Sequence, residues 1–425
     1  MVNTIPNNIN NTKNKANLEL DKESRELGLD FSKLGTIDTI EEYLTTTPGM
    51  VLAKVNTNCT LLIDDHQLPL IKSDVLAMSH YTYKMANQVS KTKSKVFSPY
   101  KKQFKHYFKR YKGQNLDGKK LLIWRTGGLG DICFTQPLIK YIKSKYPSCR
   151  ITFGTKPNNQ PIFKCWPKGL VDEVISIPFH AKQLKSHDYH ITFEGSIERC
   201  SEAHHTNCYD IFKKVACLDF EVPDYPLSIN SELSLHNKYK TIVKDNTVLI
   251  QMRASSPIRM LGSFRWAEVV RDLITKHGYN VGFIDSYDNS QMYETFIDKY
   301  ELDRSKVTNY SKYSKSINEG VAILSCCSAM IGIDSSFTHI AAGLQKPILG
   351  LYGPFLGALR MLYYPTGDWI DPVGYSECGK WPCFLHQDGI FKCPFAIDKK
   401  PSGCMLSISK DLIIKTFLNL MDRQS

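Results

Sequence analysis

The stretch KKLLIWRTGGLGDICFTQP, residues 119–137, decides how the chain is organised. Leu121 to Trp124 predict a short buried strand, followed by a glycine turn and a helix that opens near Asp131. Such a turn often builds a phosphate or nucleotide site. The glycine spacing is G-G-x-G-D rather than G-x-G-x-x-G, so the dinucleotide fingerprint is absent. A carboxylate here would repel a phosphate, so Asp131 suits proton transfer. The alternative is that Asp131 only caps its helix.

Length and composition predict a globular protein of more than one domain. The chain has 425 residues, 42% hydrophobic and 23% charged, which leaves room for two domains and an extension. It has no apolar run long enough to span a membrane, and its Asn-rich start lacks the apolar core of a secretory signal. We therefore expect a cytoplasmic protein whose thirteen cysteines are mostly reduced.

The net charge of +12 is concentrated in one segment. Residues 91–120 contain eleven Lys and Arg against a single acid, Asp117. Within it, the aromatic residues of 98–112 recur at helical spacing, which predicts a helix with one aromatic and one basic face. Such a helix could lie on an anionic membrane surface, at the inner face of a membrane. We do not expect nucleic acid as a partner. The helix could also be a connector whose aromatic face packs on the next domain.

Alternating strand and helix patterns predict an α/β protein with two Rossmann-like domains that face a cleft. We expect strands at 120–125, 150–155, 172–177 and 189–194, and in a second series at 247–252, 279–284, 329–333 and 347–352. The predicted divisions are a disordered Asn/Lys-rich tail at 1–25, an appended region at 26–115, and domains at 116–235 and 236–425. Ligands of such folds bind at the carboxyl ends of the strands.

The second half has its own turn from strand to helix, IGIDSSFTHIAAG at 331–343. Hydroxyl groups and free backbone N–H groups at a helix start can hold a diphosphate. The candidate binding residues are Asp334, Ser335, Ser336 and His339. The alternative is that a serine caps the helix and His339 is a packed, neutral side chain.

A third segment, QMRASSPIRMLGSFRWAEVVRDL at 251–273, combines small hydroxyl residues with arginines. Ser255 and Ser256 precede Arg259, which could clamp phosphate groups from across the cleft. The alternative is an ordinary surface arginine.

These motifs together resemble glycosyltransferase family 9, the ADP-heptose:lipopolysaccharide heptosyltransferases. R-T-G-G-L-G-D-x-x-x-T-x-P resembles the first signature of the family, and D-S-S-x-x-H-x-A-A resembles its C-terminal signature. The middle segment and the cysteine-bearing tail at 378–408 follow in the family's order, so the resemblance covers about 119–421.

The resemblance implies a GT-B fold and an inverting sugar transfer from a nucleotide-diphosphate sugar, without a required metal. Asp131 corresponds to the general base that deprotonates the acceptor hydroxyl. Heptose is the family's default sugar, carried by ADP, and the acceptor is a glycan of the lipopolysaccharide type or a lipid-linked one. The implied substrate-binding residues are Gly128, Gly130, Ser255, Ser256, Arg259, Asp334, Ser335, Ser336 and His339.

Two departures from the family pattern concern the donor. Arg259 stands where the family has lysine, which keeps the charge but changes the geometry. Ser336 replaces the usual glycine and adds a Cβ where the donor approaches. We expect these to affect the identity of the donor more than the fold.

The tail contains Cys378, Cys383, Cys393 and Cys404, whose spacing fits no standard zinc motif. Four thiolates in a short segment could still hold a structural zinc or iron ion. Packing of reduced cysteines is the alternative.

Two other functions are compatible with this pattern. A nucleotide-sugar epimerase of the GT-B type would have the same two-domain cleft but would need no acceptor. A sugar-binding or nucleotide-binding module that lacks catalysis would keep the fold alone.

Overall fold

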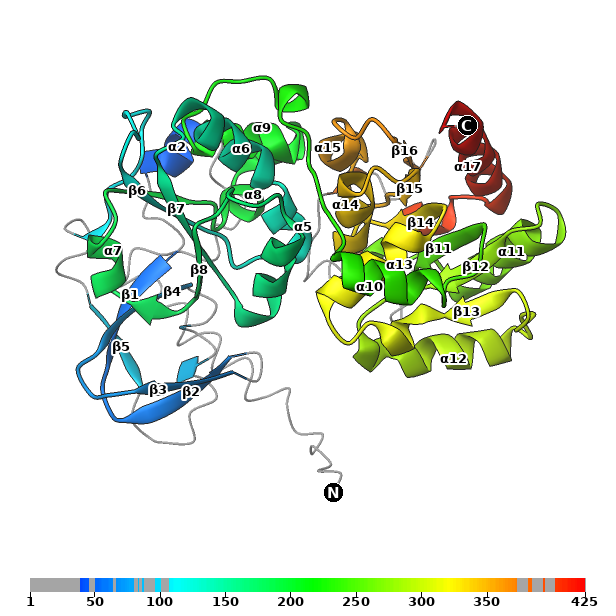
Figure 1. Cartoon of the computed structure of the whole chain (residues 1–425), viewed down its shortest axis with the longest axis horizontal. Helices are drawn as coiled ribbons and strands as arrows, with labels where there is room; N and C mark the ends of the chain where they lie inside the picture. Colours follow the sequence, from blue (N-terminus) through cyan, green and yellow to red (C-terminus); the bar gives the residue numbers. More distant parts are fainter. Residues whose placement is uncertain are drawn as a thin grey trace.

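The computed structural model describes residues 39–45, 50–63, 66–79, 83, 86–87, 96–100, 107–372, 381–383, 393 and 402–424. Two α/β halves lie side by side, and a smaller antiparallel sheet lies below the first half in the view of Figure 1. Cys378 and the predicted tail at 1–25 lie outside the described residues.

The first half contains a parallel sheet of four strands in the order β10–β6–β7–β8. Its central strand is a continuous apolar run, as expected for a strand that is covered on both faces. The strands are β6 (Lys120–Trp124), β7 (Arg150–Thr155), β8 (Glu173–Ser176) and β10 (Tyr189–Thr192). The helices are α2 (Ile40–Thr45), α5 (Leu129–Cys133), α6 (Gln136–Lys145), α7 (Lys182–Lys185), α8 (Ser196–Arg199) and α9 (Cys208–Val215), with a 3-10 helix at Pro157–Cys165.

The second half contains a parallel sheet of six strands in the order β13–β12–β11–β14–β15–β16, the doubly wound order. The strands are β11 (Thr247–Gln251), β12 (Asn280–Phe283), β13 (Val307–Asn309), β14 (Ala329–Ile333), β15 (Ile348–Leu351) and β16 (Gly367–Ile370). The helices are α10 (Leu233–Lys240), α11 (Ser263–Thr275), α12 (Ser290–Lys299), α13 (Ile317–Cys326), α14 (Ser336–Gly343), α15 (Ala358–Met361), α16 (Gly403–Leu406) and α17 (Lys410–Gln424). The two Rossmann-like units are those that the sequence predicts, although β13 and β16 were not expected.

The appended region forms a small β module that shares a strand with the first half. Its sheet has the order β5–β1–β4–β9, where β9 comes from the loop between β8 and β10. The strands are β1 (Met50–Val55), β4 (Val75–Ser79), β5 (Phe97–Pro99) and β9 (Phe179–His180), beside a hairpin of β2 (Cys59–Ile63) and β3 (His66–Leu70). Leu52 and Ala77 pack in one apolar cluster with Trp124 of β6, so the module is attached through its core as well as its backbone.

The predicted helix over 98–112 is wrong at both ends. Residues 97–99 form the strand β5, and Arg110 makes a β-bridge with His190. Tyr111 is buried, and Tyr107 and Phe108 pack against the cluster around Trp124. Residues 101–106 lie outside the described part of the chain. The aromatic side chains that are described therefore face the next domain, which is the connector interpretation.

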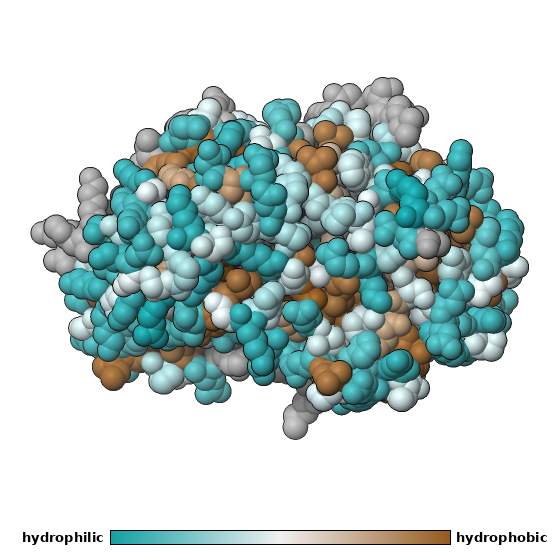
Figure 2. Space-filling model, turned by 45° about the horizontal axis from the view of Figure 1, so that its top comes forward, coloured by the Kyte–Doolittle hydropathy of each residue, from teal (hydrophilic) through white to brown (hydrophobic). Residues whose placement is uncertain are grey.

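The two halves are packed against each other through a common apolar cluster. This cluster joins residues around β6 and α9 to residues of α13 and α14. The face of the molecule in Figure 2 is mainly polar, with apolar residues in smaller patches. Among the described residues, none of the helices has the length and apolar character needed to cross a membrane.

Candidate active site

The candidate site lies where the strand order of each sheet reverses. In the first sheet this point is beside β6, and in the second it is between β11 and β14. A crevice at the carboxyl ends of parallel strands is the usual ligand site of such sheets. The glycine turn follows β6 and the Asp334 turn follows β14, so both motifs are at these points.

Asp131 is held by a buried arginine and by its own helix start. A carboxylate oxygen of Asp131 accepts a hydrogen bond of 2.8 Å from Arg125 and one of 3.1 Å from the backbone N–H of Gly128. Burial would raise the pKa of Asp131, but Arg125 outweighs it, with help from Arg360 and His339, and the pKa is lowered. Asp131 therefore caps its helix and is also an ionised carboxylate at the site. The two interpretations of this residue are compatible.

The glycine turn is fixed by carboxylates that follow β10. Arg125 is 1% exposed and also donates to Glu198 and to the carbonyl oxygen of Phe193. Glu194 accepts hydrogen bonds from the backbone N–H and the hydroxyl of Thr126. Burial raises the pKa of Glu194 although Arg125 opposes this. The turn is thus tied to the neighbouring strand before any ligand arrives.

Asp334 forms the matching ion pair in the second half. Arg259 donates to a carboxylate oxygen of Asp334 at 2.8 Å and to its backbone carbonyl at 3.0 Å. Arg259 also donates to the hydroxyl of Ser255 at 2.5 Å. Burial would raise the pKa of Asp334, but Arg259 and the more distant Arg360 lower it to about 2. The predicted phosphate clamp Arg259 is therefore already paired with a carboxylate.

The serines of the predicted donor site differ in environment. Ser335 donates to Gln251 at the end of β11, whereas Ser336 begins α14 and lines the cavity described below. Ser256 is fully buried beside Pro257, so a ligand would not reach its side chain without rearrangement of the loop.

His339 brings the two motifs together. It lies in α14, is 3% exposed, and its Nδ1 lies 2.7 Å from the hydroxyl of Tyr364. Burial lowers the pKa of His339 to about 4, against the raising effect of Asp334, so the ring is neutral at pH 7. A Cβ on Gly130 would come within 2.6 Å of the His339 ring. Glycine at 130 therefore allows the first motif to approach the second closely.

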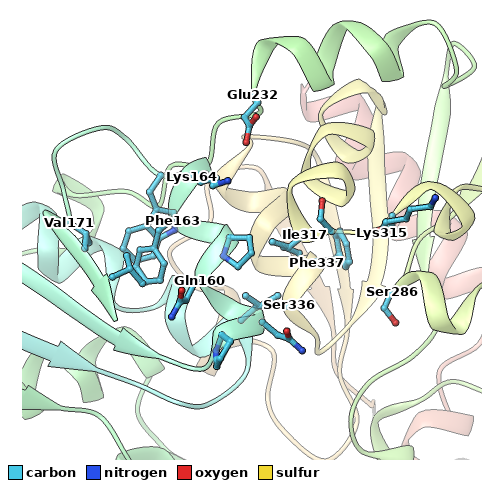
Figure 3. A pocket seen from close by; sticks show the side chains of 18 of the residues that line it. Gln160, Phe163, Lys164, Val171, Glu232, Ser286, Lys315, Ile317, Ser336 and Phe337 are labelled. Atoms are coloured by element: carbon cyan, nitrogen blue, oxygen red, sulfur yellow. The ribbon is translucent and has the colours of Figure 1, made fainter. Parts of the chain in front are cut away.

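A cavity of about 1600 Å³ opens between the two halves beside these residues. One wall comes from the 3-10 helix and the turn after it, including Gln160, Phe163 and Lys164. The opposite wall comes from the second half, where Lys315 and Ser336 lie across from them (Figure 3). The cavity reaches the site at Leu129, Gln251 and Ser336. Its size suits a drug-sized or larger ligand.

Four residues of this arrangement were missed by reasoning from sequence. Arg125 holds Asp131, Glu198 accepts a hydrogen bond from Arg125, Tyr364 contacts His339, and Arg360 affects the pKa of both aspartates. Arg125 could have been identified from the sequence, because it is the first residue of the quoted motif R-T-G-G-L-G-D. The other three stand in segments without a pattern that marks them.

The cysteine tail is only partly described. Cys404 is buried, and burial raises the pKa of its thiol to about 11, with smaller contributions from Cys383 and Cys393. Among the described residues, no group of three or more His, Cys, Asp or Glu is arranged to hold a metal ion. The described thiols therefore do not form a complete metal site.

Comparison with known proteins confirms the resemblance that the motifs predict. Residues 208–356 match the model of glycosyltransferase family 9 (heptosyltransferase). A search of curated proteins finds no significant match to the chain.

Solved structures of similar architecture confirm the GT-B fold. ADP-heptose lps heptosyltransferase II of E. coli has 15% identity and a TM-score of 0.54, over 72% of this chain and 100% of its own. A family 9 glycosyltransferase of Veillonella parvula has 16% identity and a TM-score of 0.56, over 73% of this chain and 99% of its own. At these identities the similarity establishes the fold and not the activity.

A third structure also matches the appended region. The iron-containing dodecameric glycosyltransferase TibC of E. coli has 14% identity and a TM-score of 0.52, over 89% of this chain and 93% of its own. Residues 116–425 are 310 of the 425 residues, or 73% of the chain. A match over 89% must therefore include part of residues 1–115.

Proposed function

We propose that this chain transfers a sugar from a nucleotide-diphosphate sugar to a hydroxyl group of a glycan acceptor, with inversion at the anomeric carbon. One observation carries the proposal: Asp131 and His339 come from the two family motifs, and the close approach of Gly130 to His339 puts both motifs at one site. The cavity beside them has room for both substrates.

In the proposed reaction, the Asp131 carboxylate accepts the proton of the acceptor hydroxyl. The acceptor oxygen forms a bond to the anomeric carbon, and the bond from that carbon to the diphosphate breaks. The nucleoside diphosphate leaves with the electron pair of that bond. Because the Asp131 pKa is lowered, the base is already ionised at neutral pH.

We propose ADP-heptose as the donor and a lipopolysaccharide-type glycan as the acceptor. Two similar structures support this choice, one an ADP-heptose lps heptosyltransferase and the other TibC in complex with ADP-D-beta-D-heptose. Ser255, Ser336 and Arg259 would face the donor diphosphate, although Arg259 must then share its charge with Asp334. Arginine charge in place of a divalent metal predicts that transfer persists in EDTA.

A donor screen tests this function. Thermal shift with ADP-, GDP-, UDP- and CMP-sugars should show stabilisation by one nucleotide class, in wild type and in Asp131→Asn alike. Transfer to acceptor should fall by about 10²–10⁴-fold in Asp131→Asn, the range for loss of a general base. Equal transfer by both proteins would rule Asp131 out as the base.

The same assay separates the alternatives. An epimerase would convert the free nucleotide sugar without an acceptor, so a changed sugar in the acceptor-free control would identify one. A folded protein that no nucleotide sugar stabilises would be a module without this activity.

The metal and membrane predictions are open to direct tests. A metal ion held by Cys378, Cys383, Cys393 and Cys404 predicts about one iron or zinc per chain in elemental analysis, and loss of it in Cys404→Ser. The similarity to TibC, an iron-containing glycosyltransferase, supports the test. Docking of a cytoplasmic enzyme on an anionic membrane rests on the charge of residues 91–120 alone. It predicts retention by anionic vesicles at low salt and release at high salt.

A further inference from the structure

Arg360 is a buried cation that, within the described part of the chain, has no carboxylate partner. It lies in α15, is 6% exposed, and stands over the ring of Phe355 at 5.3 Å. Its Nη1 donates to the thiol of Cys208 at 2.7 Å and to the carbonyl oxygen of Leu359 at 3.3 Å. Among the residues that the structure describes, no Asp or Glu oxygen lies within 4.0 Å of Arg360.

The other two arginines of the site are neutralised. Arg125 pairs with Asp131 and Glu198, and Arg259 pairs with Asp334. A thiol is only a weak acceptor and Cys208 stays protonated, because burial raises its pKa to about 12. Burial of a cation without a counter-charge costs several kcal/mol. A site that retains such a cation is therefore suited to an anion.

The charge of Arg360 acts on both motifs. It contributes to lowering the pKa of Asp131, that of Asp334 and that of His339, after the larger effects of burial and of closer partners. These three residues belong to the two motifs of the candidate site. The electrostatic effect of Arg360 thus extends to both motifs from α15, which follows β15.

The contact of Arg360 with Cys208 joins the two halves, and so do the hydrogen bonds beside it. Asn207 donates to the carbonyl oxygen of Ala358 at 2.7 Å, and the hydroxyls of Tyr209 and Tyr364 lie 3.2 Å apart. Separation of the halves would break these contacts and release the guanidinium from Cys208.

We infer that Arg360 binds the diphosphate of the donor and neutralises the charge that the departing nucleoside diphosphate gains. This inference rests on the proposed function and adds a residue that no motif assigns. The paired Arg259 then mainly shapes the loop around Asp334, while Arg360 supplies the positive charge.

Titration calorimetry on the full chain tests the role of Arg360. ADP, GDP, UDP and CDP are titrated, each with its nucleoside as control, into wild type, Arg360→Met, Arg360→Lys and Cys208→Ala. We expect Arg360→Met to weaken the preferred diphosphate about tenfold or more and to leave the nucleoside unchanged. Arg360→Lys should fall between. Cys208→Ala should bind as wild type does, because it removes the thiol and keeps the cation.

Each contrary result has a distinct meaning. Equal affinity of Arg360→Met and wild type for the diphosphate overturns the inference and leaves the proposed function standing. Weakening in Cys208→Ala equal to that in Arg360→Met also overturns it, because the role of Arg360 would then be its contact with Cys208. If Arg360→Met does not fold, the other two variants decide the question. Unchanged affinity in Arg360→Lys together with lost affinity in Cys208→Ala would overturn the inference. A wild type that binds no diphosphate overturns both proposals.

Discussion

The two strand-to-helix turns of this molecule contain the same kind of ion pair between aspartate and arginine, but the two aspartates differ in solvent exposure. Each places an aspartate after a central strand and pairs it with an arginine at 2.8 Å. The Asp131 side chain is 28% exposed, whereas the Asp334 side chain is 8% exposed. The partner of Asp131 is shared with a second carboxylate, Glu198, whereas among the described residues the partner of Asp334 is not shared.

Under the proposed function, this difference separates a reactive carboxylate from a structural one. Asp131 can meet a ligand from the cleft while Arg125 holds it in place. Asp334 is enclosed, and its oxygen and backbone carbonyl both serve to hold Arg259. We therefore propose different tasks for the two similar motifs, proton transfer for Asp131 and the shape of its own loop for Asp334.

The largest expected effect comes from neutralising the enclosed carboxylate. Asp334→Asn leaves Arg259 largely buried without its charge partner, which costs about 3–5 kcal/mol of the free energy of unfolding. Asp131→Asn should cost much less, because Arg125 keeps Glu198. Urea unfolding of both variants at pH 7 measures the two costs. Equal losses would show that the two turns are not different in the way described.

A smaller effect of about 3 kcal/mol is expected from His339 as the pH falls. Its pKa is about 4 in the folded chain and about 6.5 when unfolded, so below pH 6.5 the unfolded state binds a proton that the folded state does not. Stability therefore decreases as the pH falls from 6.5 to 4. His339→Gln should lose about 3 kcal/mol less over that range in urea unfolding. His190, whose pKa is also about 4, stays in both proteins and cancels in the difference.

The smallest effect concerns the glycines of the first turn. A Cβ at Gly130 would meet the His339 ring at 2.6 Å, whereas a Cβ at Gly128 would meet nothing within 4 Å. Gly130→Ala should therefore cost about 1–3 kcal/mol, the range for overpacking, and should reduce transfer. Gly128→Ala is the matched control and should be close to wild type in thermal unfolding. A neutral Gly130→Ala would mean that the two motifs are not in contact in solution.

Much of this architecture could be predicted because it depends on local patterns. Apolar runs such as Leu121–Trp124 mark parallel strands whatever their neighbours are. The close approach of Gly130 to His339 agrees with the prediction that both motifs stand at strand ends facing a cleft. Strands β13 and β16 were missed because three or four residues of mixed polarity carry little periodicity.

Interactions between distant segments could not be predicted in this way. The pairing of Arg259 with Asp334 joins residues 75 positions apart, and the sequence suggested only that Arg259 would face phosphate. The aromatic residues near 107–111 match a helical period, yet Phe108 stacks at 5.3 Å on His190, which stabilises extended backbone there. Arg360 stands in LGALRM, where nothing local marks a functional arginine.

Strand β9 completes the sheet of the appended module, and this has a consequence for synthesis of the chain. The module is translated before the first Rossmann-like half, but β4 cannot pair on its open edge until Phe179 and His180 have left the ribosome. Until then, Leu52 and Ala77 also lack Ile177 and Phe179 as packing partners in their apolar cluster. The nascent module should therefore be vulnerable to proteolysis and aggregation, and a truncated gene that ends before β9 should yield mostly insoluble product.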